Sequence, residues 1–282
     1  MTCYELVHWR SHDDPYLKNV PVSIILTMEN SPRQLQFETH GIHKICKNTF
    51  VQHNRGYKTC TKSMCVQDNC FEVHKPYQDL FHALLNCFKE FEEVKDPILV
   101  MEDDCELLRY DKMKKHMFKV DTFVLNEHFD VYTLGSIFPK AARENGHLRI
   151  FGKSSGAHAV IYSYKVRQVM LQTALQSQKL HIDNLVSLYD LRYVYTYSKP
   201  LAIQKIPMTE NAKKWITPKR KIALVLTAID KGNPLPWKFI YFFAGYKNAA
   251  AFICFTPFII LMISGVIASV MHILAKAWSS RS

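Results

Sequence analysis

Short apolar runs and segments with helical spacing alternate along most of the chain. The run VSIILTM at residues 22–28 is rich in branched side chains and ends in a turn sequence, which predicts a strand, a turn and then a helix from Pro32. In residues 79–93 the apolar side chains recur on one helical face. Asp96-Pro97 separates this predicted helix from the apolar run at residues 98–101, which predicts the next strand.

The alternation continues further along the chain. Residues 129–137 and 157–163 have the composition of strands, residues 165–178 that of a helix, and residues 192–206 that of two more strands. Alternating strands and helices are typical of a sheet covered by helices, so we expect one α/β domain over residues 1–215. A chain of 282 residues can bury one core of that size.

The C-terminal part of the chain has a different pattern. Residues 249–275 contain no Asp, Glu, Lys or Arg, and about 20 apolar residues in a helix span a bilayer. This segment is therefore predicted to be a transmembrane helix rather than a core helix, which is seldom apolar all the way round. Residues 216–248 mix aromatic and basic side chains, as a juxtamembrane segment at a membrane interface does.

The distribution of charge bears on orientation and partners. The net charge is +11, and the basic residues before residue 249 outnumber those after residue 275. By the positive-inside rule we expect a single-pass, C-terminally anchored protein whose large domain is cytosolic, and residues 1–14 are too polar for a secretory signal. The basic segment leads towards the predicted span, so its expected partner is the lipid bilayer and not a nucleic acid.

Cysteine spacing tests the predicted compartment. Of eight cysteines, Cys60, Cys65 and Cys70 recur every five residues. In a lumenal protein this cluster would predict disulfides, and in a cytosolic one it predicts free thiols. A zinc site would have to recruit nearby histidines, and the spacing differs from the CxxC of a zinc ribbon. With a cytosolic domain, we expect a reduced cluster in a surface loop.

Candidate chemistry begins directly after the apolar run at residues 98–101, where Glu102, Asp103 and Asp104 follow one another. Ligand sites of open α/β sheets lie beyond the carboxyl ends of the strands. Adjacent carboxylates repel one another, and a divalent cation offsets that repulsion; Mg²⁺ is commonly held by one or two carboxylates and the phosphates of a substrate. From these residues alone, a solvated acidic turn that caps a helix is an equal alternative.

From about Ser23 to Trp215 the chain resembles the family 25 glycosyltransferases, the lipopolysaccharide-type and procollagen galactosyltransferase group, and especially their versions in large DNA viruses. Seven segments carry the resemblance in the family's order: SIILTMENSPRQ, DLFHALLNCF, ILVMEDDCEL, FDVYTLGS, SSGAHAVIYS, HIDNLVSL and PLAIQKIPMTENAKKW. The resemblance implies a GT-A-like fold, which is a single nucleotide-sugar-binding domain with a mixed sheet. It also implies inverting transfer of a sugar, such as galactose or glucose, from a nucleotide-diphosphate donor to a hydroxyl of a glycan, protein or lipid.

The same resemblance implies roles for individual residues. Glu102 and Asp104 would bind Mn²⁺ or Mg²⁺ on the diphosphate, and Asp103 would contact the ribose or the sugar. Arg33 is expected near the nucleotide, and His158 beside the donor. Taken alone, His158 is more readily explained as a core histidine whose hydrogen bonds are satisfied.

Inverting transfer needs a base that takes the proton of the acceptor hydroxyl while the metal stabilises the departing diphosphate. Asp183, in HIDNLV, is the first candidate, and Glu210, in MTENAKKW, is the second. Asp183 could equally cap a helix that starts at Asn184.

Two features depart from the family. Residues 42–78 match it only loosely, and the predicted span at residues 249–275 has no counterpart in the bacterial members. The alternative function is therefore a non-catalytic, membrane-anchored interaction protein that keeps the fold. Such a protein would lack metal-dependent binding of nucleotide sugars.

Overall fold

The computed structural model describes residues 2–39, 41–66, 69–108, 113–135, 141–150, 158–172, 191–198 and 200–204. The chain divides into two compact units, Met1–Gly245 and Tyr246–Ser282, and every described residue belongs to the first. The juxtamembrane segment and the membrane span predicted at residues 216–248 and 249–275 lie outside this part. Within it, no helix has the length and apolar character needed to cross a membrane.

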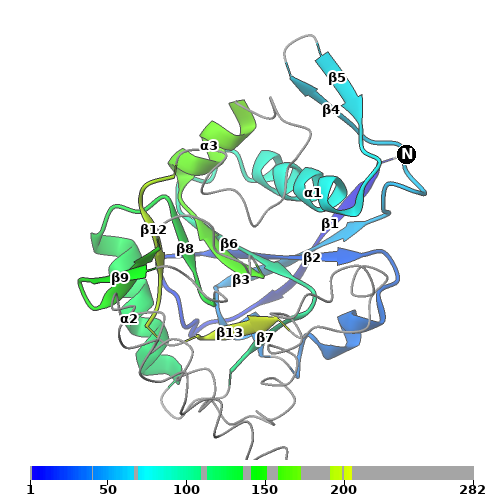
Figure 1. The fold of residues 1–282 in the computed structure, drawn as a ribbon. Coiled ribbons are helices and arrows are strands. Elements are labelled where there is room, and N and C mark those ends of the chain that lie inside the picture. The colour runs from blue at the N-terminus through cyan, green and yellow to red at the C-terminus, as the bar shows by residue number, and fades with distance from the viewer. Residues whose placement is uncertain are drawn as a thin grey trace, which may run out of the picture. The chain divides into compact units, whose positions relative to one another are not determined.

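A nine-stranded mixed sheet forms the centre of the first unit (Figure 1). In spatial order its strands are β1 (Tyr4–Ser11), β3 (Asn48–Asn54), β2 (Val22–Met28), β6 (Ile98–Glu102), β11 (Ala159–Tyr162), β8 (Val131–Thr133), β12 (Val194–Thr196), β10 (His147–Ile150) and β9 (Ala141–Glu144). Strands β3, β2 and β6 are parallel neighbours, β8 is parallel to β12, and β11 runs antiparallel between β6 and β8. The predicted α/β class is confirmed.

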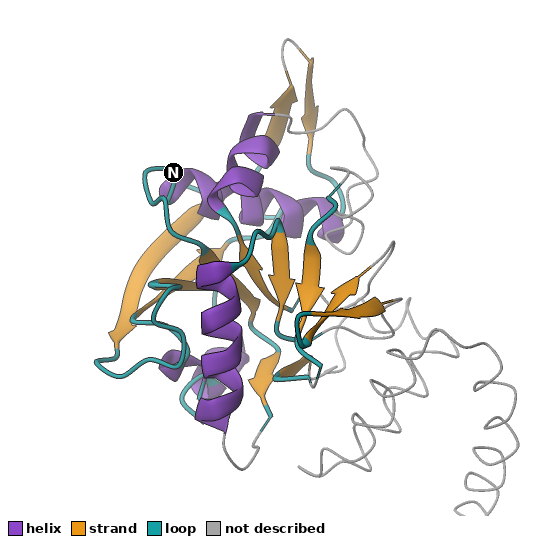
Figure 2. Cartoon of the chain, turned by 90° about the vertical axis from the view of Figure 1, so that its left-hand side faces the viewer, coloured by secondary structure: helices purple, strands orange, loops and turns teal. Residues whose placement is uncertain are grey.

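Helices cover both faces of the sheet (Figures 1 and 2). Helices α1 (Pro76–Glu90) and α3 (Tyr164–Gln172) pack on one face, and α2 (Met113–Asn126) packs on the other. Successive side chains of a strand point to opposite faces, so a strand covered on both sides is apolar throughout. This explains the continuous apolar run of β6, whose alternate residues belong to two separate core clusters.

Smaller elements complete the described part of the chain. They are the 3₁₀ turns η1 (Pro32–Gln36) and η2 (Ile42–Lys44), the hairpin of β4 (Ser63–Val66) with β5 (Asn69–Glu72), and the pair of β7 (Cys105–Leu107) with β13 (Ala202–Gln204). The β4–β5 hairpin stands away from the nine-stranded sheet in both views (Figures 1 and 2).

Several predicted elements are found with small changes of boundary. The strand at residues 22–28 has the predicted bounds, and the helix predicted from residue 79 begins at Pro76, where proline needs no helical N–H partner. The segment after Pro32 is a 3₁₀ turn rather than an α-helix. Helix α2 is missing from the prediction, although Met117, Val120 and Val124 have the spacing of a buried helical face.

The cysteine cluster is organised differently from the prediction. Cys60 forms a disulfide with Cys3, at a Cα–Cα distance of 5.7 Å, so the expectation of a reduced thiol is wrong for Cys60. Cys65 and Cys70 are register partners across the β4–β5 hairpin, so they lie on strands and not in a loop. Disulfides are typical of oxidising compartments. The cytosolic placement stays a prediction, and this disulfide does not favour it.

Candidate functional site

The carboxyl ends of the neighbouring strands β2 and β6 form a topological switch point of the sheet. After β2 the chain returns to β3 on one side, and after β6 it continues to strands on the other side. The two strands are parallel neighbours, with Leu26 paired to Glu102. Open α/β sheets bind their ligands at such a topological switch point. The acidic residues 102–104 therefore begin at the position where the fold favours a ligand site.

Asp103 connects the segments that follow these two strands. Its Oδ2 accepts hydrogen bonds from Thr27 Oγ1 and Ser31 Oγ, both at 2.9 Å, and its Oδ1 accepts one from Arg33 Nη1 at 2.5 Å. Asp103 is 8% exposed, so these bonds are largely shielded from water. All three donors come from the end of β2 or from the segment after it. The carboxylate therefore holds that segment against the end of β6.

Local sequence explains how Arg33 reaches this position. Asn30 has a φ of 62°, in the left-handed region that asparagine tolerates better than most residues, and this reverses the chain after β2. Ser31 then caps the turn η1, where its Oγ accepts a hydrogen bond from the Arg33 N–H, and Pro32 occupies the first position of the turn. The sequence NSPR thus places the Ser31 hydroxyl, which donates to Asp103, and the Arg33 guanidinium, which forms an ion pair with Asp103.

Asp104 lies beside the same guanidinium. Its Oδ2 is 3.9 Å from Arg33 Nη1, and the residue is 8% exposed. Glu102 is more exposed, and its backbone N–H donates to the carbonyl of His158 at 2.9 Å. Arg33 therefore offsets part of the repulsion between Asp103 and Asp104, but it brings one positive charge against these two carboxylates.

His158 is 1% exposed and lies directly before β11. Its Nε2 donates to the carbonyl oxygen of Ala202 at 3.2 Å, and burial lowers the pKa of the imidazole from 6.5 to about 4, so the ring is neutral. Gly135 packs beside this bond: a Cβ there would lie 1.9 Å from the Ala202 oxygen and 3.0 Å from His158 Nε2. These contacts agree with a buried core histidine, but its hydrogen bonds are not all satisfied, because the buried Nδ1 has no partner among the described residues. The role of His158 beside a donor stays a prediction.

The structure thus brings together Arg33, Asp103 and Asp104, and it joins Glu102 to His158 through a backbone hydrogen bond. The two candidate bases, Asp183 and Glu210, lie outside the described residues. Sequence reasoning missed Thr27 and Ser31 as donors to Asp103. A serine before Pro32 is a recognisable capping signal, whereas nothing in the sequence near Thr27 indicates its partner.

The predicted metal ligands are Glu102 and Asp104, and both oxygens of Asp103 accept hydrogen bonds within the protein. Among the described residues, no group of three or more His, Cys, Asp or Glu side chains is arranged to hold a metal ion. Mg²⁺ in nucleotide sites is commonly held by one or two carboxylates together with substrate phosphates. Binding of a metal by Glu102 and Asp104 together with substrate phosphates stays a prediction.

Comparisons with known proteins add little to this geometry. No protein-family model matches the chain, and no curated protein matches it. Among solved structures, A197 from STIV is similar at 17% sequence identity, over 67% of this chain and 86% of that one, with a TM-score of 0.37. A TM-score this low does not bear on the fold or the function of this chain.

Proposed function

We propose that the chain is a metal-dependent glycosyltransferase, anchored to a membrane by residues 249–275, that transfers a hexose from a nucleotide-diphosphate donor to a hydroxyl of a glycan, protein or lipid. The observation that carries the proposal is the cluster of Arg33 with Asp103 and Asp104 at the switch point between β2 and β6. Its position is the one at which open α/β sheets bind ligands. The resemblance to family 25 supports the reaction class, and a GT-A-like fold is part of the proposal.

Each residue of the cluster has a distinct task in this proposal. Glu102 and Asp104 would hold Mn²⁺ or Mg²⁺, which supplies Lewis-acid stabilisation of the departing diphosphate when bound. Arg33 uses Nη1 for both carboxylates, and a guanidinium has further N–H groups that can donate to phosphate oxygens. Asp103 positions Arg33, and its contact with the ribose or the sugar stays a prediction. Asp183, with Glu210 as the second candidate, would take the proton of the acceptor hydroxyl.

The test measures donor binding by the full chain in detergent, with thermal unfolding as the readout. UDP-, GDP- and CMP-sugars are compared with and without Mn²⁺, because a ligand that binds only the folded state raises its apparent stability. We expect a manganese-dependent rise in Tm with one nucleotide, and its loss in Asp104→Asn. The matched control is Asp14→Asn, which removes the charge of a surface carboxylate paired with Lys114.

Two results of this test would contradict the proposal. One is a folded wild-type chain whose Tm responds to no donor, and the other is an Asp104→Asn variant that keeps the full response. The first result would favour the alternative, a non-catalytic membrane-anchored interaction protein, and the second would remove Asp104 from the metal site. One observation favours that alternative already: Asp103 has three donors within the protein, as a purely structural carboxylate does.

A further inference from the structure

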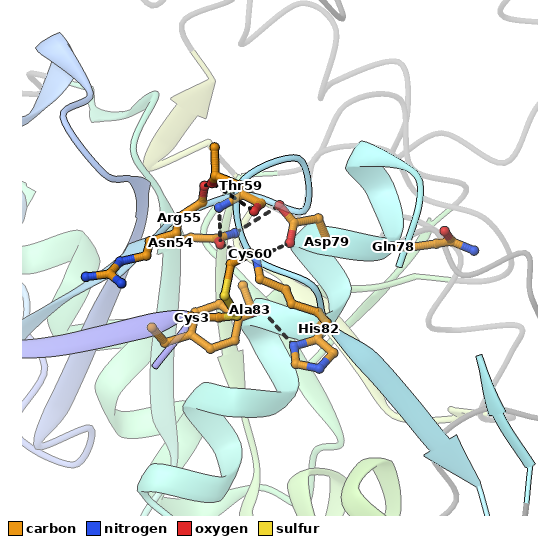
Figure 3. Close-up of polar contacts among 12 residues, drawn as sticks. Cys3, Asn54, Arg55, Thr59, Cys60, Gln78, Asp79, His82 and Ala83 are labelled. Carbon is orange, nitrogen blue, oxygen red and sulfur yellow. Dashed lines mark hydrogen bonds and ion pairs between the residues drawn. A yellow bond between two sulfur atoms is a disulfide. The ribbon is translucent and has the colours of Figure 1, made fainter. Parts of the chain in front are cut away.

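A second cluster of buried polar groups lies at the carboxyl end of β3, against the first turn of α1 (Figure 3). Lys62 Nζ contacts Asn54 Oδ1 and Asp79 Oδ1. Asn54 Nδ2 in turn donates to Asp79 Oδ2 at 3.2 Å. The Lys62 and Asp79 side chains are 1% and 7% exposed. A single carboxylate therefore bridges an amine and an amide, and those two groups are also in contact with each other.

The surroundings of the amine keep water away. The ring of Tyr4 lies 4.8 Å from Lys62 Nζ, and its hydroxyl bonds to His82 Nδ1 at 2.7 Å. The Cys3–Cys60 disulfide lies one residue from Tyr4 and two residues from Lys62 in the chain. Burial lowers the pKa of Lys62, which favours the neutral, nucleophilic amine over the ammonium.

The amide of Asn54 is also polarised. The backbone N–H of Gly56 donates to Asn54 Oδ1 at 2.8 Å, at the oxygen that would carry negative charge if the amide carbon were attacked. Gly56 has a φ of +77°, a backbone conformation that residues with a side chain rarely adopt, so glycine is favoured at the position that aims this N–H. One buried site thus holds a nucleophilic amine (Lys62), an electrophilic amide (Asn54) and a carboxylate that can carry protons (Asp79). The Gly56 N–H is placed there to stabilise an oxyanion.

We propose that Lys62 and Asn54 form an intramolecular isopeptide bond, with Asp79 as the proton carrier. Asp79 takes a proton from the Lys62 ammonium, and the free amine attacks Asn54 Cγ. The Gly56 N–H stabilises the resulting oxyanion. Asp79 passes a proton to Nδ2 and receives one from Nζ, the Cγ–Nδ2 bond breaks, and ammonia leaves. The product is a secondary amide between Nζ and Cγ. Asp79 returns to the carboxylate by giving its remaining proton to the departing ammonia, which leaves as ammonium, so no oxidant or co-reactant is needed.

The bond would have a defined structural effect. It would join the end of β3 to the segment before the β4–β5 hairpin, and the Cys3–Cys60 disulfide already joins the same segment to the start of β1. The isopeptide would close residues 54–62 into a loop, and the disulfide would tie that loop to Cys3. Unlike the disulfide, the isopeptide would persist under reducing conditions.

The test is intact mass spectrometry of the reduced, denatured full chain, followed by tryptic mapping. We expect a mass lower than that of the sequence by one ammonia, and a peptide ending at Arg55 joined to a peptide that contains Lys62 uncleaved. Lys62→Arg and Asp79→Asn should both have the full mass of their sequences. The matched control is Asp121→Asn, a buried carboxylate that bonds Asn19, which should keep the loss of ammonia.

Three outcomes would overturn the inference. A wild-type chain of full mass means that Lys62 and Asp79 form an ordinary buried ion pair. Loss of water instead of ammonia, with Lys62 joined to Asp79, means that the asparagine is not the electrophile. An Asp79→Asn variant that still forms the cross-link would show that Asp79 is not the proton carrier. None of these readouts depends on glycosyltransferase activity.

Discussion

Arg33, in the turn after β2, donates to Asp103, in the turn after β6. From these two neighbouring strands the chain continues to opposite sides of the sheet. The two residues are 70 positions apart in the sequence, and Nη1 lies 2.5 Å from Oδ1. Through this contact the turn after β2 and the acidic turn after β6 form one structural unit. A ligand bound by Asp104 would therefore meet a guanidinium that is already held in position.

We predict that Asp103→Asn lowers the free energy of unfolding by about 2 kcal/mol, because hydrogen bonds to a buried charge are among the stronger ones. Urea unfolding followed by tryptophan fluorescence measures the change. Glu38→Gln is the control, because Glu38 pairs with Arg10 at an exposed site, with side chains 59% and 47% exposed. Its effect should stay within about 0.5 kcal/mol. Equal effects of the two substitutions would show that Asp103 is not a structural anchor.

Arg167 is predicted to stabilise the end of α1. Its Nη1 and Nη2 donate to the carbonyl oxygens of Phe91, Val94 and Asp96 at 2.8, 2.5 and 2.9 Å, and the residue is 0% exposed. Arg167→Met would leave these acceptors without their donor, so we expect a loss of about 3 kcal/mol in urea unfolding. Lys165→Met, at an exposed position of the same helix, should change stability little. A small effect of Arg167→Met would mean that water replaces the guanidinium.

We predict that the free energy of unfolding decreases as pH is lowered, because the buried imidazole of His158 resists protonation in the folded chain. Because burial lowers its pKa from 6.5 to about 4, the unfolded chain takes up a proton between these values while the folded chain does not. The contribution is complete above pH 6.5 and is lost as pH falls towards 4, by up to about 3 kcal/mol. Unfolding measured from pH 7.5 to 4.5 should show a shallower slope for His158→Gln than for wild type. Equal slopes would contradict a neutral buried ring.

The Cys3–Cys60 disulfide should stabilise the domain mainly by restricting the unfolded chain. The two residues are 57 positions apart, and closing a loop of that length is worth about 4 kcal/mol in the chain-entropy model. Reducing agent should therefore lower the urea midpoint of wild type. It should not change the midpoint of the Cys3→Ser/Cys60→Ser double variant, which contains the buried free cysteines but lacks the bridge. An unchanged wild-type midpoint would show that the disulfide is not formed in solution.

Local pattern accounts for the elements that build the centre of the sheet. The strand β2, the helix α1 and the strand β6 were predictable because each carries an uninterrupted apolar run or an apolar helical face. The edge strand β1 was not, because its residues alternate only between partial and full exposure and no residue of it is buried. A strand at the edge of a sheet has few contacts that select for apolar side chains.

The sequence by itself determined the α/β class and placed three carboxylates at the end of a buried strand, because these features depend on neighbouring residues. Only the tertiary structure decided which groups meet there. Thr27 and Asp103 are 76 positions apart, and Cys3 and Cys60 are 57 apart, so no local pattern could pair them. Their contacts follow from strand order: parallel pairing of β2 with β6 aligns the carboxyl ends of both strands, and antiparallel pairing of β1 with β3 brings the start of the chain to the end of β3.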